Sequence, residues 1–299
     1  MLYYYKPFIS RDYIYSCDGL RIKFVLNNLP DVKNLMIYLD KIGGDYYKST
    51  RHFTFQNLFV FNTGITSISV GLGFISDKVK VKEGFIDFNP NKIFGSFYNE
   101  YPVLNHDEDI DNPFLHSNNL KKTVLDILET IKSYSHEYYV LRYDLAVDIP
   151  CSRTDIFLIK DRRKYLQFRK SNEDITEYLG ARSSAGYVKI YNKMIESELT
   201  FKLTRIEVTE TNFNYDEAVK EFPDIYFRCN DYSDSVLFDC LNYLPVDMFN
   251  LFFSRLNYRT RQKYITTYEK QKIKLNKASF KAITDNIFNL VGCKNEYDS

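Results

Sequence analysis

Residues 178–196 read YLGARSSAGYVKIYNKMIE. Two of its segments have the composition of β-strands, and the turn between them is rich in Ser, Ala and Gly, which predicts an antiparallel hairpin. The second strand places Tyr191 between Lys189 and Lys193. Since alternate residues of a strand share a face, these three side chains would lie together. Tyr191 is then either a core aromatic or a nucleophile in a basic site.

Composition limits the functional classes without choosing among them. The chain has 299 residues, 44% of them hydrophobic, which is enough for a sizeable core. The net charge is +1, so any nucleic-acid interpretation must rest on how charge is distributed. The chain contains 26 Tyr and 24 Phe, so most of its tyrosines need no special role.

Cysteine spacing and hydropathy indicate a reduced, cytoplasmic protein without a membrane partner. No two of the five cysteines are two or four residues apart, which argues against a zinc site or a redox pair. The N-terminus does not read as a signal peptide. The most apolar window, LFVFNTGITSISVGLGFI, is interrupted by polar residues and Gly, and it indicates a hairpin.

The chain predicts an α+β fold, with a mainly antiparallel sheet, helices on one face and the active site on the other, followed by a mostly helical C-terminal region. Hydrophobic periodicity predicts the following elements: strands at 20–26, within 52–88, at 139–149 and at 201–209, helices at 30–41 and 119–134, a short basic helix near 153–164, and mostly helix from about 215. The acidic loop HDEDIDNP at 106–113 is either a solvated loop or a cation site.

Side-chain parity separates an apolar face from an ionisable face in three predicted strands. The apolar set is Leu141, Tyr143, Leu145, Val147, Ile149, Val188, Ile190, Ile206 and Val208. The opposite set is Arg142, Asp144, Ala146, Asp148, Tyr187, Lys189, Tyr191, Lys193, Arg205 and Glu207. An ordinary antiparallel sheet also has a core face and a water face. Asp is disfavoured in strands, however, so two Asp in one strand indicate a functional role.

Carboxylates, basic groups and a phenol on one face suit the attack of a tyrosine on a DNA phosphodiester. The phenol has an ordinary pKa of about 10, so it is a weak nucleophile at neutral pH. Nearby Lys or Arg would favour the phenolate. A divalent cation on two or three carboxylates would neutralise charge on the phosphoryl oxygens, and all-oxygen ligands suit Mg²⁺ or Mn²⁺.

Three motifs together resemble the replication initiation factor (Rep_trans) family. YLGARSSAGYVKIYNKMIE resembles its hairpin and tyrosine strand, RYDLAVD its Asp-containing strand, and TRIEVT its R-x-E strand, in family order over roughly residues 139–210. The family comprises rolling-circle initiators of plasmids and phages and related conjugative relaxases. The resemblance implies an enzyme that nicks one strand of origin DNA through a phosphotyrosine, rejoins it later and needs a metal ion.

The resemblance also implies roles for individual residues. Tyr191 would be the nucleophile, assisted by Lys193 and Arg205, and Asp144 and Glu207 would be the leading metal ligands, followed by Asp148 and Glu196. The phosphate-binding candidates are Arg142, Arg182, Lys189, Lys193 and Arg205. Lys189 stands where Arg is usual in the family. The match before residue 139 is poor, so it places no N-terminal carboxylate ligand. Origin duplex, single-stranded DNA, a second copy of the chain and a host replicative helicase are the implied partners.

A basic segment near the C-terminus suggests a second DNA contact. Between residues 255 and 281 there are nine basic residues and a single acidic one, Glu269. The DNA-binding candidates here are Arg255, Arg259, Arg261, Lys263 and Lys270. The alternative is a solvated helical face. With this assignment, residues 1–214 would form the nicking and joining domain, and residues 215–299 a helical, basic DNA-recognition region.

Other functions remain open from sequence alone. A conjugative relaxase of the same family would share the chemistry. A non-catalytic, sequence-specific DNA-binding protein would explain the basic segment but not the two strand aspartates. A metal nuclease that uses water would form no covalent link to DNA.

Overall fold

The computed structural model describes residues 13–48, 55–62, 66–73, 82–94, 113–182, 184–199, 201–211, 222–228, 244 and 246–293. Residues 106–112 of the acidic loop, for which the sequence allows a cation site, lie outside these residues. The side chains at 113–120 and 267–271 are also outside the description, and they include Leu120 and Lys270. Within the described residues the fold is α+β, as predicted.

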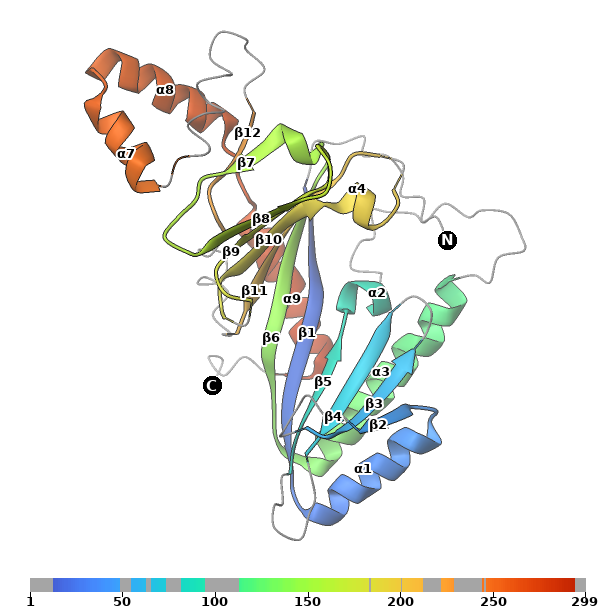
Figure 1. Cartoon of the computed structure of the whole chain (residues 1–299). Helices are drawn as coiled ribbons and strands as arrows, with labels where there is room; N and C mark the ends of the chain where they lie inside the picture. The colour runs from blue at the N-terminus through green and yellow to red at the C-terminus, as the bar shows by residue number, and fades with distance from the viewer. Residues whose placement is uncertain are drawn as a thin grey trace.

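One antiparallel sheet of ten strands organises the described part of the chain (Figure 1). Its strands are β1 (Ile14–Leu26), β2 (Asp45–Lys48), β3 (Asn57–Asn62), β4 (Ser67–Leu72), β5 (Glu83–Phe88), β6 (Ser135–Ile149), β8 (Tyr165–Arg169), β9 (Ile175–Leu179), β10 (Tyr187–Asn192) and β11 (Thr204–Glu210). Their order is β2-β3-β4-β5-β1-β6-β11-β10-β9-β8, so the long strands β1 and β6 form the middle. The strands β7 (Ile156–Leu158) and β12 (Ile225–Phe227) pair separately.

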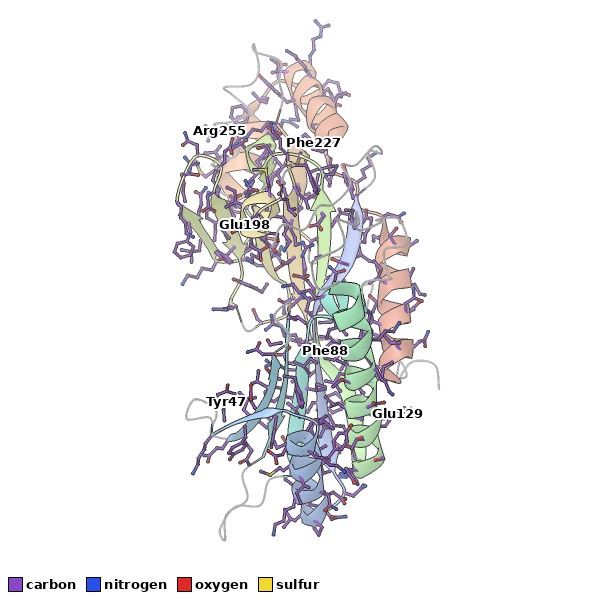
Figure 2. All side chains as sticks on the ribbon, turned by 90° about the vertical axis from the view of Figure 1, so that its right-hand side faces the viewer. Tyr47, Phe88, Glu129, Glu198, Phe227 and Arg255 are labelled. Atoms are coloured by element: carbon purple, nitrogen blue, oxygen red, sulfur yellow. The ribbon has the colours of Figure 1, made fainter. Side chains whose placement is uncertain are left out.

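Three amphipathic helices cover one face of this sheet: α1 (Leu29–Lys41), α3 (Pro113–Tyr134) and α9 (Lys277–Val291). The helices α3 and α9 lie side by side (Figure 2). Lys132 Nζ of α3 donates to the carbonyl of Gly292, directly after α9, over 3.1 Å. Shorter helices are α2 (Pro90–Phe94) and α4 (Lys193–Glu196), and the hairpin of α7 (Val246–Arg255) and α8 (Tyr258–Gln271) lies at one end of the molecule.

The apolar stripes predicted from sequence are buried against the sheet. In α1, Val32, Leu35 and Leu39 are fully buried, and Asn28 caps the helix by accepting from the Asp31 amide over 2.9 Å. In α3 the buried residues are Val124, Ile127, Leu128 and Ile131. Helix α9 adds Phe280, Ile287, Phe288 and Val291 to the same core. The sheet therefore keeps its other face for polar side chains.

Leu141 does not lie on the apolar face where strand parity placed it. Its side chain is 38% exposed, whereas its neighbour Val140 is 2% exposed. The register explains the difference, because Arg21 lies opposite Arg142 while Ile22 lies opposite Val140. Leu141 is the extra residue of a β-bulge, which reverses the alternation on its N-terminal side.

The prediction of a short basic helix near 153–164 is wrong. The segment contains one 3₁₀ turn, Arg153–Asp155, followed by the strand β7. The residues of β7 pair with β12 from a distant part of the chain, and this tertiary pairing outweighs local helix preference. Arg153 is not a surface cation either, because it is 3% exposed and forms an ion pair with Glu177.

The C-terminal region is mostly helical in its described parts, although not as one continuous helix. Helix α7 ends at Arg255, and α8 covers 258–271. The chain is then extended before α9, and the Ile273 amide donates to the carbonyl of Ile225 over 2.8 Å. Among the described helices none has the length and apolarity needed to cross a membrane.

Candidate active site

The polar face of the sheet is ordered by the register of β10, β11 and β6. Three cross-strand rows result: Tyr191–Arg205–Asp148, Lys189–Glu207–Ala146 and Tyr187–Thr209–Asp144. The intervening residues Val188, Ile190, Ile206 and Val208 are at most 1% exposed and face the core. The predicted alternation of β10 and β11 is therefore confirmed, and the ionisable residues of three strands share one face.

Tyr191 is 4% exposed, but its hydroxyl lies among polar groups. It donates a hydrogen bond of 2.5 Å to Oε1 of Glu207. Lys189 Nζ lies 3.7 Å from the centroid of the Tyr191 ring, and Lys193 Nζ lies 5.8 Å from it. Both distances are within the range of cation–π attraction. Tyr191 thus sits between a carboxylate and two ammonium groups, as its position between two lysines suggested.

The protonation state of this pair differs from the expected phenolate. Burial raises the pKa of Tyr191 above its ordinary value, and the Glu207 carboxylate raises it further, while Arg205 opposes this only in part. Burial, and then the Asp18 carboxylate, raise the pKa of Glu207 to about 7. The tyrosine keeps its proton, and Glu207 is placed to accept that proton as a general base.

Arg205 and Asp148 are bound to each other, so Arg205 is not free to bind phosphate and Asp148 is not free to bind a metal ion. The Nε and NH2 atoms of Arg205 each donate over 2.6 Å to one oxygen of Asp148, and NH1 lies 2.9 Å from Oδ1 of Asp18. Arg205 is 4% exposed and Asp148 is 5% exposed. A charge buried this deeply must be compensated, and a bidentate pair does so. Both oxygens of Asp148 are therefore occupied by the guanidinium.

Asp18 is a site residue that sequence reasoning missed. In β1, Cys17 lies opposite Leu145 and Gly19 lies opposite Asp144, so Asp18 is the extra residue of a β-bulge. Its Oδ1 also accepts a hydrogen bond of 3.1 Å from Asn89. Although burial opposes the shift, Arg205 and then Lys193 lower the pKa of Asp18 to about 2. The signal was an Asp-Gly pair inside an otherwise regular strand.

Asp144 is held by the neighbouring strands. It accepts hydrogen bonds from Thr209 Oγ1 over 2.6 Å and from Arg142 NH2 over 3.1 Å. Burial raises its pKa despite the opposing charge of Arg142. A Cβ at Gly19 would lie only 2.5 Å from Oδ2 of Asp144. A side chain at this strand position would therefore displace the carboxylate of Asp144 from its present place.

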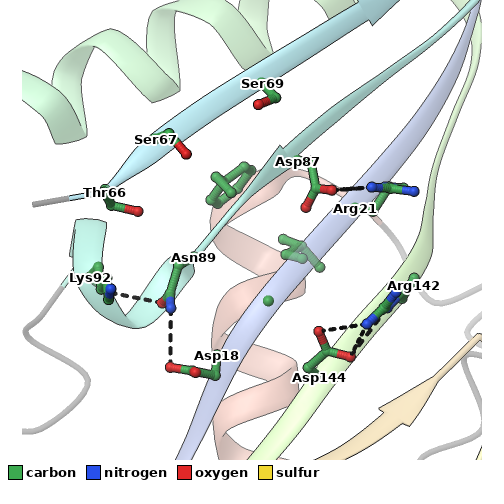
Figure 3. Close-up of a pocket in the computed structure, with 13 residues that line it drawn as sticks. Asp18, Arg21, Thr66, Ser67, Ser69, Asp87, Asn89, Lys92, Arg142 and Asp144 are labelled. Carbon is green, nitrogen blue, oxygen red and sulfur yellow. Dashed lines mark hydrogen bonds and ion pairs between the residues drawn. The ribbon is translucent and has the colours of Figure 1, made fainter. Parts of the chain in front are cut away.

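A polar pocket of about 400 Å³ adjoins these residues (Figure 3). It is lined by β1, β4, β5, β6 and α2, and its charged residues are Asp18, Arg21, Asp87, Lys92, Arg142 and Asp144. Arg21 donates from Nε to Asp87 over 3.0 Å. Asp18 joins the pocket to the Tyr191 cluster, since it contacts both Asn89 and Arg205. Arg21 and Asp87 were not among the predicted site residues.

The other predicted residues lie around this centre or far from it. Lys193 and Glu196 form an ion pair of 2.5 Å in α4, and Arg182 is exposed in the turn before β10. The candidates Arg255, Arg259, Arg261, Lys263 and Lys270 lie on α7 and α8, at one end of the molecule and away from the strand β10. Arg261 donates to the carbonyls of Phe253, Ser254 and Leu256, so its guanidinium caps the end of α7 and is not directed at a ligand.

The donor chemistry around Asp144 and Glu207 fits a hard divalent cation, although no complete ligand set is formed. Among the residues that the structure describes, no three His, Cys, Asp or Glu side chains gather as metal ligands. Asp148 is bound to Arg205, and Glu196 is bound to Lys193. The pKa of Asp144 and that of Glu207 are raised, chiefly by burial, although Arg142 binds Asp144 and Lys189 Nζ lies 4.0 Å from Glu207. Their carboxylate oxygens suit Mg²⁺ or Mn²⁺.

Comparisons with known proteins were made for the whole chain. No protein-family model matches it, and no curated protein matches it. Among solved structures, it is similar to a rolling-circle replication initiator protein from Geobacillus stearothermophilus, with a TM-score of 0.41 and 12% identity over 75% of this chain and 89% of that chain. Similarity at this level establishes neither fold nor activity. Membership of the replication initiation factor family therefore stays a prediction from the three motifs.

Proposed function

We propose that this protein is a rolling-circle replication initiator that nicks one DNA strand through a phosphotyrosine and later rejoins it. The observation that carries the proposal is the hydroxyl of Tyr191, which donates over 2.5 Å to Glu207 beside the ammonium of Lys189. A phenol, a proton acceptor and a cation are the groups that phosphoryl transfer to tyrosine requires. A buried structural tyrosine would also need a hydrogen-bond acceptor, but it would not need two ammonium groups beside its ring.

The proposed reaction exchanges one phosphate ester for another. Oε1 of Glu207 accepts the proton of Tyr191 while the phenolic oxygen attacks the scissile phosphorus. The bond from phosphorus to the 3′ oxygen breaks, and that oxygen leaves as a 3′-OH after taking a proton from solvent. The 5′ phosphate stays on Tyr191, and a 3′-OH reverses these steps to rejoin the strand. Lys189, whose side chain is 30% exposed, is placed to bind the phosphate.

A divalent cation fits this proposal. Asp144 and the second carboxylate oxygen of Glu207 would hold it, since Oε1 of Glu207 accepts the proton of Tyr191, and the cation would neutralise charge on the phosphoryl oxygens. Arg205 acts differently from the role implied by the family resemblance. Its contacts with Asp148 and Asp18 make it a positioning residue that fixes the strands under Tyr191.

The whole chain incubated with a 3′-labelled single-stranded oligonucleotide tests this function. A protein–DNA band that survives denaturation is expected, because the labelled fragment keeps its 5′ phosphate on the protein. A water-dependent nuclease would release both fragments, and a non-catalytic DNA-binding protein would leave the oligonucleotide intact. Either outcome would exclude the proposed chemistry. The three functions are therefore distinguished by three different band patterns on a denaturing gel.

Metal removal should abolish the covalent band. With EDTA we expect no adduct, and Mn²⁺ or Mg²⁺ in excess should restore it. The variant Asp144→Asn should shift the Mn²⁺ concentration for half-maximal adduct upward by at least about tenfold, since ligand-shell changes weaken metal affinity by that order. Asp87→Asn is the matched control, because Asp87 lines the same pocket and is not a proposed ligand. An equal yield of adduct in EDTA and in Mn²⁺ would show that the reaction does not need a metal ion.

A further inference from the structure

The polar face of the sheet continues past Tyr191 onto β9 and the edge strand β8. In the register, Lys189 of β10 lies opposite Tyr178 of β9, which lies opposite Leu166 of β8. Phe168, two residues after Leu166, points the same way. Tyr187 also shares this face, since it is four residues before Tyr191. Leucine, phenylalanine and tyrosine side chains near this edge of the sheet therefore share a face with the proposed nucleophile.

Three of these side chains form a connected aromatic row, Phe168, Tyr178 and Tyr187. The rings of Phe168 and Tyr178 meet edge to face, with centroids 5.9 Å apart and planes at 82°. The rings of Tyr178 and Tyr187 are stacked, with centroids 5.8 Å apart and planes at 18°. The row comes from three successive strands of a rigid sheet, so its geometry is set before any ligand binds.

The aromatic row is open to solvent in a way that folding alone does not explain. Phe168 is 56% exposed, and Leu166 beside it is 46% exposed. Tyr178 and Tyr187 are half-buried. A single exposed apolar side chain is ordinary, whereas a contiguous exposed patch on an edge strand marks a binding surface.

Cations border the aromatic row, and they indicate what binds to it. Lys189 connects the row to the active site, because it lies opposite Tyr178 in the register and over the ring of Tyr191. Arg142 donates from NH2 to Thr209 over 3.3 Å, and Thr209 lies directly opposite Tyr187. Arg182 is exposed in the turn that leads into β10. Aromatic rings interleaved with basic groups suit a strand of unpaired nucleotides.

We propose that the aromatic row is a stacking platform for the unpaired bases of single-stranded DNA next to the scissile phosphate. Lys189 and Arg142 bind the phosphates of the same strand. Bases in a duplex are stacked on one another and cannot reach the rings, so the platform selects melted DNA. This inference rests on the proposed function, because it names the form of DNA that reaches Tyr191.

The test measures binding without cleavage, in EDTA, by fluorescence anisotropy of a short labelled single-stranded oligonucleotide. Phe168→Ala and Tyr187→Ala should each weaken binding by about tenfold, which is the order expected for loss of one base–aromatic stack. Tyr187→Phe keeps the ring, so it should recover the affinity that Tyr187→Ala loses. Tyr47→Ala is the matched control, since Tyr47 is 51% exposed on β2, which lies at the opposite edge of the sheet from β8.

An abasic oligonucleotide separates stacking from phosphate contact. It keeps every phosphate but makes no stack, so the parent protein should bind it about 100-fold more weakly than the ordinary strand, and Phe168→Ala should lose no further affinity on it. The salt dependence of binding should be the same for the parent protein and Phe168→Ala, because no phosphate contact is removed.

Several results would overturn the platform. Unchanged affinity in both alanine variants would do so, as would an equal loss on ordinary and abasic strands. A dimer in sedimentation that becomes a monomer in Phe168→Ala, with unchanged DNA affinity, would assign the exposed edge to a second copy of the chain. The test is independent of the chemistry. A missing covalent adduct would reject the proposed function and leave the binding result intact, whereas normal adduct formation with unchanged binding would reject the platform alone.

Discussion

Tyr191→Phe is expected to abolish the covalent protein–DNA adduct while leaving DNA binding intact. The substitution removes one oxygen atom and keeps the ring between Lys189 and Lys193. In the proposed reaction that oxygen is the attacking atom, and loss of a nucleophile lowers the rate by about 10⁴-fold or more. Strand joining should fall equally, because it uses the same phosphotyrosine. The measurement is the rate of adduct formation on a single-stranded oligonucleotide, with anisotropy for binding.

Tyr187→Phe is the matched control for this substitution. Tyr187 lies four residues earlier on the same strand and the same face, opposite Thr209, whereas Tyr191 lies opposite Arg205 and donates to Glu207. The variant should form the adduct at nearly the parent rate. If Tyr191→Phe still forms the adduct, or if both variants lose it equally, Tyr191 is not the nucleophile.

Arg205→Ala is expected to cause the largest loss of folding stability. Its guanidinium is the partner of Asp148 in the buried row beneath Tyr191, and it also contacts Asp18. Removing it leaves a carboxylate that is 5% exposed without its cation. Breaking a buried ion pair in this way costs about 3–5 kcal/mol of the free energy of unfolding. Urea denaturation with a common slope would measure the change.

Arg21→Ala is the control for burial, because Arg21 pairs with Asp87 on the same sheet while its side chain is 35% exposed. That pair is hydrated, and its loss should cost less than about 1 kcal/mol. Asp148→Asn removes the buried negative charge itself and should destabilise the fold less than Arg205→Ala. Equal unfolding midpoints for Arg205→Ala and Arg21→Ala would show that the buried network does not hold the strands together.

The tyrosine hairpin could be predicted from sequence because its alternation is unbroken. In β10 and β11, a one-residue shift of register would turn the charged side chains into the core. The buried apolar residues Val188 and Ile206 therefore fix which face is polar. The same reasoning brought Tyr191 and Glu207 to one face, and the structure joins them by a hydrogen bond. Parity alone was sufficient here, since neither strand contains a bulge.

Parity failed where a strand carries an extra residue. The bulge in β6 turned Leu141 outward, and the bulge in β1 brought Asp18 to Arg205. Both bulges depend on how β1, with 13 residues, pairs with β6, with 15 residues. Local sequence patterns do not specify that pairing. An Asp-Gly pair within a strand was the visible signal at residue 18, and Leu141 carried none.

Electrostatic pairing was the other limit of sequence reasoning. Strand parity showed that Arg205 and Asp148 share a face, but not that they neutralise each other. It also suggested a phenolate at Tyr191, because it counted nearby cations without the cost of burial. In the folded protein, burial and Glu207 raise the pKa of that tyrosine. The need for a base follows only from the three-dimensional arrangement.

The most direct test of the account is the chemical identity of the residue that becomes joined to DNA. The whole protein is allowed to react with a single-stranded oligonucleotide, the DNA is trimmed with nuclease, and tryptic peptides are analysed by mass spectrometry. The account predicts added nucleotide mass on residues 190–193, with the phosphate on the oxygen of Tyr191. Nucleotide mass on any other tyrosine, or cleaved DNA with no modified peptide, would contradict it.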